Sequence, residues 1–279
     1  MQVVKHINDL QPILNDQRKL GLSIGFIPTM GALHNGHLSL VEMAGRQTGF
    51  VVVSIFVNPT QFNDKSDLAR YPRDLQKDIS LLEGSSCNLV FAPDTEEIYP
   101  EPDTRQFNFG ELEQVMEGKF RPGHFNGVAQ VVCKLFDIIQ PEKAFFGQKD
   151  FQQLAIINEL VRNLELSVEI VSCPIIREPD GLAMSSRNSL LNPDERQNAV
   201  HISATLIEAV NKTVELSVEE LCLWVVNRIN QNKYLHVEYF QVVNEKSLLP
   251  VINWSDQGKK VGCIAVHCGK IRLIDNIEF

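Results

Sequence analysis

The sequence lacks features that several classes of protein require. It has 26 basic residues against 35 acidic ones, which gives a net charge of −9, and it contains no long block of lysine or arginine. A nucleic-acid surface normally needs a basic stripe, so a nucleic-acid partner is not expected. No apolar run is long enough to span a bilayer, and residues 1–6 lack the apolar core of a signal peptide. We therefore expect a cytoplasmic protein with no membrane partner.

The six cysteines also lack a metal or disulfide pattern. None belongs to a C-x-x-C pair, and most lie within apolar runs, so buried free thiols are expected. A chain of 279 residues with 44% hydrophobic residues is typical of a globular protein with one large or two modest domains. It is long enough to bury a sizeable core without disulfides or structural metals.

Short apolar segments alternate with helical patterns over the first 173 residues. Strand, helix, strand alternation predicts a parallel sheet with right-handed crossovers. The fold class is therefore predicted to be α/β, with residues 1–173 forming a Rossmann-like domain. Strands are expected at residues 22–27, 51–57, 88–91, 143–146 and 167–171, and helices at 38–44, 74–82, 127–139 and 151–163.

The pattern changes after a breaker-rich link that contains Pro174, Pro179 and Gly181. Residues 174–279 are predicted to form a smaller α+β C-terminal domain with an antiparallel sheet. Its last two strands are expected to form a hairpin at Gly269-Lys270. The expected helices are 193–212 and 218–230, and the expected strands are 237–242, 261–267 and 271–274.

The segment from Pro28 to His37 lies where the first expected strand ends and a helix begins. Ligands bind at this edge of an open α/β sheet, and the first turn of a helix offers N–H groups and a positive dipole end to phosphate. Gly31 and Gly36 allow the backbone to approach a ligand closely. The imidazoles of His34 and His37 can donate hydrogen bonds to phosphate oxygens. The segment predicts a nucleotide triphosphate site, although a His-x-x-His pair alone is also found on surfaces and in metal sites.

Other polar residues follow the expected strands. The Gln61 amide can donate to a carboxylate and accept from a hydroxyl, whereas Asn-Pro before it is by itself a common turn. The Lys149 ammonium would neutralise phosphate charge, and Asp150 is a candidate N-cap. Arg121 suits an oxyanion but equally suits a solvated loop.

Two further features allow two interpretations each. The serines and arginine of Ser185-Ser186-Arg187 would clamp a triphosphate, or they form a capping loop before Pro193. Asp78 is expected to be a solvated helix carboxylate, with a position near magnesium as the alternative.

The string Pro-Thr-Met-Gly-Ala-Leu-His-Asn-Gly-His resembles the HIGH signature of the nucleotidylyltransferase superfamily. In this extended form it is similar to the signature of the pantothenate synthetase (pantoate–β-alanine ligase) family. The resemblance continues in the family order over nearly the whole chain. The matching strings are Asn58–Phe62, Arg70–Asp74, Arg121–Phe125, Gly147–Asp150 and Met184–Arg187. The last resembles a KMSKS loop with one basic residue, and Gln148 stands where many members have glutamate.

The resemblance implies an ATP-dependent ligase that condenses (R)-pantoate with β-alanine to pantothenate. The implied route passes through pantoyl adenylate and releases AMP and pyrophosphate. It also implies Mg²⁺ with unassigned ligands, a homodimer, and a lid role for residues 174–279. The implied catalytic residues are His34, His37, Lys149 and Arg187, and the implied pantoate contacts are Gln61 and Gln153. The implied ATP-binding residues are Met30, Gly31, Ala32, Leu33, His34, Asn35, Gly36, His37, Gly147, Gln148, Lys149, Asp150, Ile176, Met184, Ser185, Ser186 and Arg187.

Three other functions fit the same motifs less well. A cytidylyl- or adenylyltransferase acting on a phosphate ester would use the same histidines, but Gln61 and Gln153 suit a small hydroxy acid better. A non-catalytic nucleotide-binding regulator would not need His34, His37, Lys149 and Arg187 together. A tRNA-charging role fits poorly with the net charge and with the lack of an anticodon domain.

Overall fold

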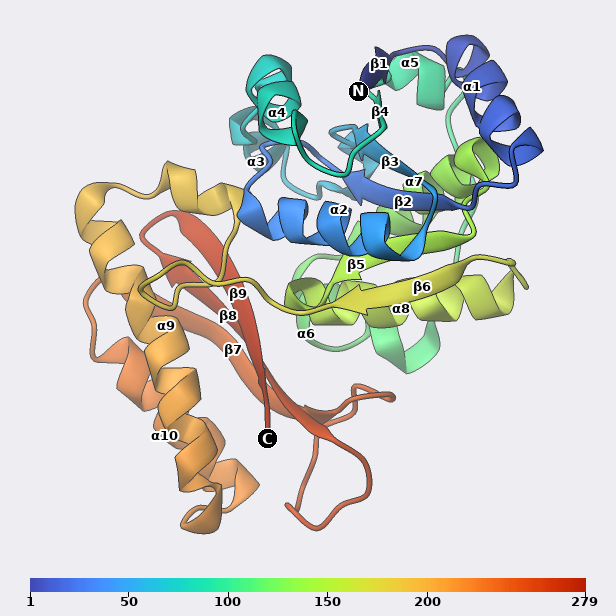
Figure 1. The fold of residues 1–279 in the computed structure, drawn as a ribbon. Helices are drawn as coiled ribbons and strands as arrows, with labels where there is room; N and C mark the ends of the chain where they lie inside the picture. The colour runs from blue at the N-terminus through green and yellow to red at the C-terminus, as the bar shows by residue number, and fades with distance from the viewer. The chain divides into compact units, whose positions relative to one another are not determined.

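The computed structural model describes all residues, 1–279, and these form two compact units. The first unit comprises residues 1–109, 121–148 and 156–174. The second comprises residues 110–120, 149–155 and 175–279. Figure 1 shows the helices and strands of both. The functional division predicted between residues 173 and 174 stays a prediction.

A six-stranded parallel sheet forms the centre of the first unit, with the strand order β1-β4-β3-β2-β5-β6. From β2 the chain builds the sheet outward through β3 and β4, and it then crosses to β5 and β6 on the other side. Ligands bind at such a switch point in open α/β sheets. The predicted Rossmann-like sheet is confirmed. The strands are β1 (Gln2–Val4), β2 (Ile24–Thr29), β3 (Phe50–Ile55), β4 (Leu89–Phe91), β5 (Lys143–Gly147) and β6 (Glu169–Cys173).

Helices cover both faces of this sheet (Figure 1). Successive residues of a strand point to opposite faces. Ile27 belongs to a buried cluster with Val41 of helix α2 (Asn35–Gln47). Phe26 points the other way, and its ring centroid lies 6.3 Å from that of Phe136. Phe136 lies on α7 (His124–Ile139), which contacts α1 (Ile7–Lys19).

The predicted helices and strands are all present, with bounds that differ by a few residues. Strand β1 and helix α1 were not predicted. The helix contains Pro12, and its two buried residues, Leu10 and Leu14, give a weak periodic signal. The short helices were also missed. The remaining helices are α3 (Lys65–Arg70), α4 (Leu75–Leu82), α5 (Thr95–Ile98), α6 (Met116–Phe120) and α8 (Phe151–Asn163).

The second unit contains a three-stranded antiparallel sheet with the order β7-β8-β9. The predicted hairpin is confirmed, because Cys268 pairs with Ile271 across Gly269-Lys270. Two helices are each opened by a capping box, which pairs an N-cap side chain with a glutamate three residues later. The strands are β7 (Leu235–Asn244), β8 (Lys260–Cys268) and β9 (Ile271–Glu278), and the helices are α9 (Pro193–Asn211) and α10 (Val218–Asn230).

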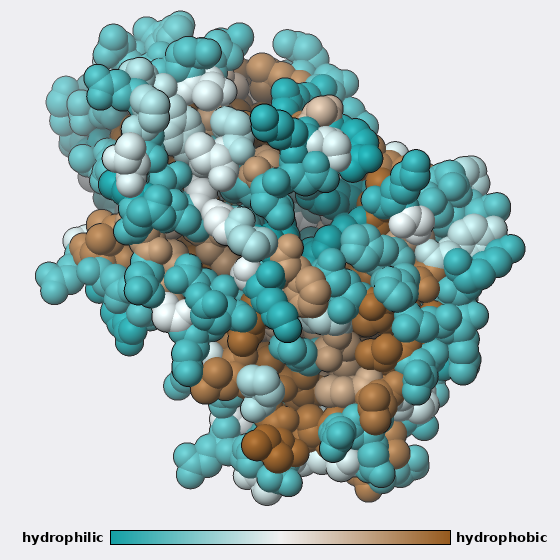
Figure 2. All heavy atoms as spheres, turned by 180° about the vertical axis from the view of Figure 1, so that it is seen from behind, coloured by the Kyte–Doolittle hydropathy of each residue, from teal (hydrophilic) through white to brown (hydrophobic).

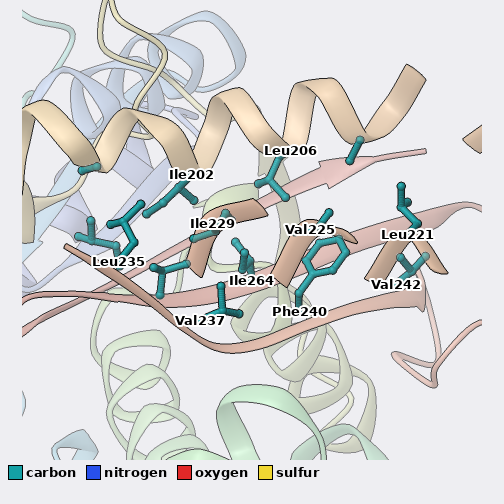
Figure 3. Packing of buried hydrophobic residues seen from close by; sticks show 14 of the residues in the cluster. Ile202, Leu206, Leu221, Val225, Ile229, Leu235, Val237, Phe240, Val242 and Ile264 are labelled. Carbon is teal, nitrogen blue, oxygen red and sulfur yellow. The ribbon is translucent and has the colours of Figure 1, made fainter. Parts of the chain in front are cut away.

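The core of the second unit lies between these helices and the sheet. Figure 3 shows Ile202 and Leu206 of α9 and Val225 of α10 pointing toward Phe240 and Ile264 of the sheet. Burying such aliphatic and aromatic side chains contributes roughly 1.5–3 kcal/mol each. This core gives β9 a rigid setting, since its inward residues are part of the same cluster.

The surface is mixed in polarity. Figure 2 shows hydrophilic residues over most of one face, with hydrophobic residues gathered in its lower part. Exposed large apolar residues of the chain include Ile207, Val214, Leu223 and Ile252. No helix combines the length and the apolar character that a membrane crossing requires.

Candidate active site

The two histidines of the Pro28–His37 segment cap helix α2. His34 is the N-cap residue, and its Nδ1 accepts a hydrogen bond from the Gly36 N–H at 3.1 Å. His37 Nδ1 accepts from the His34 N–H at 3.3 Å, so the pair forms a reciprocal capping box. Because each Nδ1 is an acceptor, each neutral ring carries its proton on Nε2. The ring centroids lie 4.1 Å apart. The arrangement makes two adjacent Nε2–H donors at a helix N-terminus.

A buried carboxylate holds the loop before these histidines. Asp78 Oδ1 accepts from the Leu33 N–H at 2.7 Å, and Oδ2 accepts from the Ala32 N–H at 2.9 Å. The loop needs this support because Ala32 has φ +49°, which is unfavourable for a residue with a Cβ. Gly31 has φ +77°, and a Cβ there would lie 2.9 Å from Asp78 Oδ2. Glycine is therefore required by both conformation and space.

Asp78 was expected to be solvated, and this expectation was wrong. Its relative exposure is 3%, because α4 turns the carboxylate toward the loop rather than toward water. Burial raises the pKa of Asp78, and the N–H groups of Leu33 and Ala32 offset part of that rise. A sequence signal for this contact was weak, since 45 residues separate Asp78 from Leu33.

Gln61 follows β3 and lies buried beside Met30, with its Nε2 donating to Met30 Sδ at 3.0 Å. The structure thus joins the two predicted segments of the first unit. Asn58, which is 1% exposed, donates from Nδ2 to Gln61 Oε1 at 3.2 Å and to the Gly127 carbonyl at 3.1 Å. Tyr99 donates its hydroxyl proton to Asn58 Oδ1 at 3.0 Å. These contacts fix the orientation of the Gln61 side-chain amide. Its oxygen accepts from Asn58, and its NH₂ group points toward Met30.

A histidine holds the Gln61 backbone. His124 Nδ1 lies 2.8 Å from the Gln61 carbonyl oxygen, and His124 Nε2 lies 3.1 Å from Arg121 Nη1. Arginine only donates, so Nε2 is the acceptor and Nδ1 carries the proton that is donated to Gln61. Gly127 allows this packing, because a Cβ there would lie 2.7 Å from Gln61 Cα. Neither His124 nor Asn58 was among the predicted site residues, although both lie within strings that were singled out.

Gly147 ends β5, and Gln148 begins the short 3-10 turn that follows it. The next residues belong to the second unit. Lys149 is 18% exposed, and its Nζ lies 3.6 Å from Asp150 Oδ2. Gln153 lies in the first turn of α8 and is partly buried. The predicted Lys149 and Gln153 therefore share one short segment of the second unit.

The remaining predicted residues form a hairpin-like loop in the second unit. Arg177 and Ala183 form an antiparallel bridge, and the Met184 N–H donates to the Ile176 carbonyl at 2.9 Å. Ser185 then caps a 3-10 turn, with its Oγ accepting from the Arg187 N–H at 3.2 Å. The pairing brings Ile176 next to the Met184–Arg187 segment, as a shared nucleotide contact would require.

No group of three or more histidine, cysteine, aspartate or glutamate residues forms a metal-binding cluster. The cysteines are unsuited to nucleophilic chemistry. Burial raises the pKa of Cys87, Cys133 and Cys173 to about 11 each, so these thiols stay protonated.

Comparison with known proteins gives one consistent result. The family model described as pantoate-beta-alanine ligase matches residues 2–278. A pantothenate synthetase of Bacteroides thetaiotaomicron is 53% identical over 100% of this chain and 99% of its own length. One from Porphyromonas gingivalis is 50% identical over the same shares.

Solved structures agree with these matches. The pantothenate synthetase of Thermus thermophilus has a TM-score of 0.93 and 41% identity, covering 100% of this chain and 99% of that one. The pantoate-beta-alanine ligase of Francisella tularensis, complexed with beta-gamma ATP and beta-alanine, has a TM-score of 0.80 and 36% identity. It covers 100% of this chain and 97% of its own. With its HIGH-type loop, its strand order and these matches over its whole length, the chain belongs to the pantoate–β-alanine ligase family.

Proposed function

We propose that this chain condenses pantoate with β-alanine to pantothenate at the expense of ATP. Family membership over the whole chain supports this, as does the complex of a relative with beta-gamma ATP and beta-alanine. The single structural observation that carries it is the capping pair of His34 and His37 at the start of α2, in the same segment as Met30, which the buried Gln61 amide contacts. Donors at a helix start suit a triphosphate, and a fixed amide suits a small hydroxy acid.

The reaction has two steps. A pantoate carboxylate oxygen attacks the α-phosphorus of ATP, the new O–P bond forms, and pyrophosphate leaves with the bridging oxygen. The resulting acyl adenylate has a good leaving group, which a free carboxylate lacks. The β-alanine amine then attacks the acyl carbon, AMP leaves, and the amine loses a proton. No covalent enzyme nucleophile is needed.

In this proposal the protein acts by stabilising charge that moves toward pyrophosphate. His34 and His37 donate to the phosphates, with the backbone of Gly31 to Leu33 close by. Lys149 and Arg187 neutralise the phosphate charge. Fixed donors of this kind stabilise the transition state without reorganising. The other proposed ATP contacts are Met30, Asn35, Gly36, Gly147, Gln148, Asp150, Ile176, Met184, Ser185 and Ser186.

Gln61 and Gln153 are proposed to bind pantoate. Asn58 donates to Gln61 Oε1 and one N–H of the Gln61 NH₂ group donates to Met30 Sδ, so the second N–H is the donor proposed for the ligand. An N–H donor suits the pantoate carboxylate, and it would leave one carboxylate oxygen available for attack on phosphorus. Arg121 would help indirectly, because it supports His124 and through it the Gln61 backbone.

Mg²⁺ is proposed to act together with ATP. Mg²⁺ sites of this kind usually use substrate phosphates, water and one or two carboxylates rather than an all-protein cage, which agrees with the lack of a metal-binding cluster. When bound, the ion would neutralise charge on the phosphates. We also propose a cytoplasmic homodimer that acts on small molecules, without a nucleic-acid or membrane partner. Sedimentation equilibrium tests the dimer.

Isotope exchange tests the proposed reaction. Labelled pyrophosphate should enter ATP when Mg²⁺ and pantoate are present and β-alanine is absent. Oxygen-18 in the pantoate carboxylate should appear in AMP after the full reaction, because that oxygen attacks phosphorus. A nucleotidylyltransferase acting on a phosphate ester would release no AMP. Label in inorganic phosphate, with ADP as the co-product, would mean acyl-phosphate chemistry and would overturn the proposal.

A further inference from the structure

Two consecutive residues of strand β9 hold the two phosphate-binding segments of the second unit. Asp275 and Asn276 are 4% and 6% exposed, which is unusual for polar residues near the end of a chain. Neither is part of the sequence motifs that define the site. Both contact segments to which the proposed function assigns ATP contacts, so the inference rests on that proposal.

Asp275 anchors the hairpin that carries Met184–Arg187. Its two carboxylate oxygens accept from Arg177 Nη1 and Nη2 at 2.7 and 3.0 Å, a bidentate pair. Arg177 also donates to the Gly181 carbonyl at 3.2 Å. The guanidinium therefore contacts both the hairpin and β9, and Arg177 also pairs with Ala183 through its backbone.

Asn276 anchors Lys149. Its Nδ2 donates to the Lys149 carbonyl oxygen at 3.0 Å. Fixing this carbonyl fixes the plane of the peptide that contains the Lys149 Cα, and this restricts the position from which the Lys149 side chain leaves the backbone. The contact spans 127 residues of sequence.

The two anchors lie on opposite faces of the sheet, because successive residues of a strand alternate. Leu273 and Ile277 pack in the cluster formed with α9 and α10, so Asp275 shares that face. Arg272 lies on the other face with Asn276, and it pairs there with Glu117. Two adjacent residues of β9 thus link the hairpin and Lys149 through non-covalent contacts.

We propose that Asp275 and Asn276 are positioning residues that keep Lys149 and the Met184–Arg187 segment in register for the ATP triphosphate. A displacement of about 1 Å at a reacting group can cost roughly 10²-fold in rate. The effect is restricted to the step that uses the triphosphate. Transfer of the pantoyl group from a preformed adenylate to β-alanine needs no triphosphate contact.

The test compares Asn276→Ala and Asp275→Asn with Glu238→Gln, in the full-length enzyme. Glu238 accepts from Arg272 within the same sheet, so the control also breaks a partly buried charged contact there without touching either ATP segment. We expect pantoate-dependent pyrophosphate exchange to fall roughly 10²-fold in the first two variants. Pantoyl transfer from synthetic pantoyl adenylate should be unchanged in all three.

Hydrogen exchange gives a second, independent measurement. Asn276→Ala should raise exchange in residues 148–152, and Asp275→Asn should raise it in residues 176–188. Equal losses in both half-reactions, or the same exchange defect in Glu238→Gln, would overturn the proposal in favour of general destabilisation. Unchanged pyrophosphate exchange in both variants would overturn it as well. If the wild-type enzyme itself showed no pantoate-dependent exchange, the proposed function would fail, whereas hydrogen exchange would still test the two anchors.

Discussion

The proposed phosphate-binding segments of the first unit and of the second are held by contacts of different range. In the first unit, His34 and His37 cap their own helix through contacts two and three residues apart. In the second, Arg177 and Lys149 are held by residues 98 and 127 positions away. Local contacts leave a motif in the sequence, whereas long-range contacts leave isolated polar residues. This is why the first segment is conspicuous in the sequence and the anchors of the second are not.

The two kinds of contact also differ in energy. Losing a helix cap typically costs about 1 kcal/mol. Removing one partner of a fully buried ion pair typically costs about 3–5 kcal/mol, and the Arg177–Asp275 pair, in which only Asp275 is fully buried, should cost less than that but more than a cap. The two histidine rings of the first unit are therefore held by small local terms, although the loop before them also depends on the distant Asp78, whereas both anchors on β9 in the second unit are long-range contacts. Mutations in each unit test this difference between local and long-range contacts.

The largest effect is expected for His37→Ala. It removes the Nε2–H donor that we propose contacts the phosphates, and losing one preorganised donor costs on the order of 10²–10³ in turnover. The lost cap contributes only about 1 kcal/mol to stability. Pantoate-dependent pyrophosphate exchange and thermal unfolding measure the two effects separately.

His37→Gln is the matched control, because glutamine at this position restores the capping acceptor. It should recover stability without recovering turnover. A folded His37→Ala enzyme with near-normal adenylation would remove histidine from the proposed mechanism.

Features that depend on local contacts were predictable from the sequence, and features that depend on long-range contacts were not. The parallel sheet was predictable because its strands are nearly continuous apolar runs, as buried parallel strands are. Helix α1 was not, since Pro12 and few apolar residues hide its periodicity. In the site, His34 and Gln61 stood at strand ends, where ligands bind. Asp78, Asp275 and Asn276 act across tens of residues, and a single sequence carries no signal for such pairing.

Gln61→Ala should have the next largest effect. It leaves a polar group of pantoate unpaired in the site, at a cost of roughly 1–3 kcal/mol, so the KM for pantoate should rise while ATP binding stays nearly intact. Gln11→Ala is the control, because it removes a partly buried hydrogen bond from a glutamine amide to the Ile138 carbonyl elsewhere in the same unit. Calorimetry that showed equal losses for ATP and pantoate would point to a structural defect instead.

Asp78 gives a pH-dependent test. Since its pKa is raised in the folded state, the folded protein holds the proton more tightly than the unfolded chain does. Its contribution to stability is therefore fully present below the ordinary aspartate pKa and is lost as pH rises through the folded value. The stability difference between wild type and Asp78→Asn should fall as pH rises through this window. Urea unfolding at a series of pH values measures it.

Asp103→Asn should show the opposite slope, because hydrogen bonding to Arg105 lowers the pKa of Asp103. That contribution is present above the ordinary aspartate pKa and is lost as pH falls. Parallel pH slopes for the two variants would contradict the opposite pKa shifts assigned to Asp78 and Asp103.

Asp78→Asn should also affect ATP binding. An amide NH₂ would face one of the two loop N–H groups, so the KM for ATP should rise.

The smallest effect is expected for Asp180→Asn. Asp180 pairs with Arg196 at 2.7 Å on the same hairpin that Arg177 ties to β9, but its side chain is 43% exposed. Hydrogen bonding to Arg196 lowers the pKa of Asp180, so the stabilisation is present above the ordinary aspartate pKa and is lost as pH falls through the folded value. Solvent screening limits such a pair to about 0–1 kcal/mol, and the pair should weaken further in high salt. Thermal unfolding at pH 7 should therefore separate Asp180→Asn clearly from Asp275→Asn. Similar losses of thermal stability in the two variants would mean that every ion pair of the hairpin contributes equally, and that the contact between Arg177 and Asp275 of β9 has no special role.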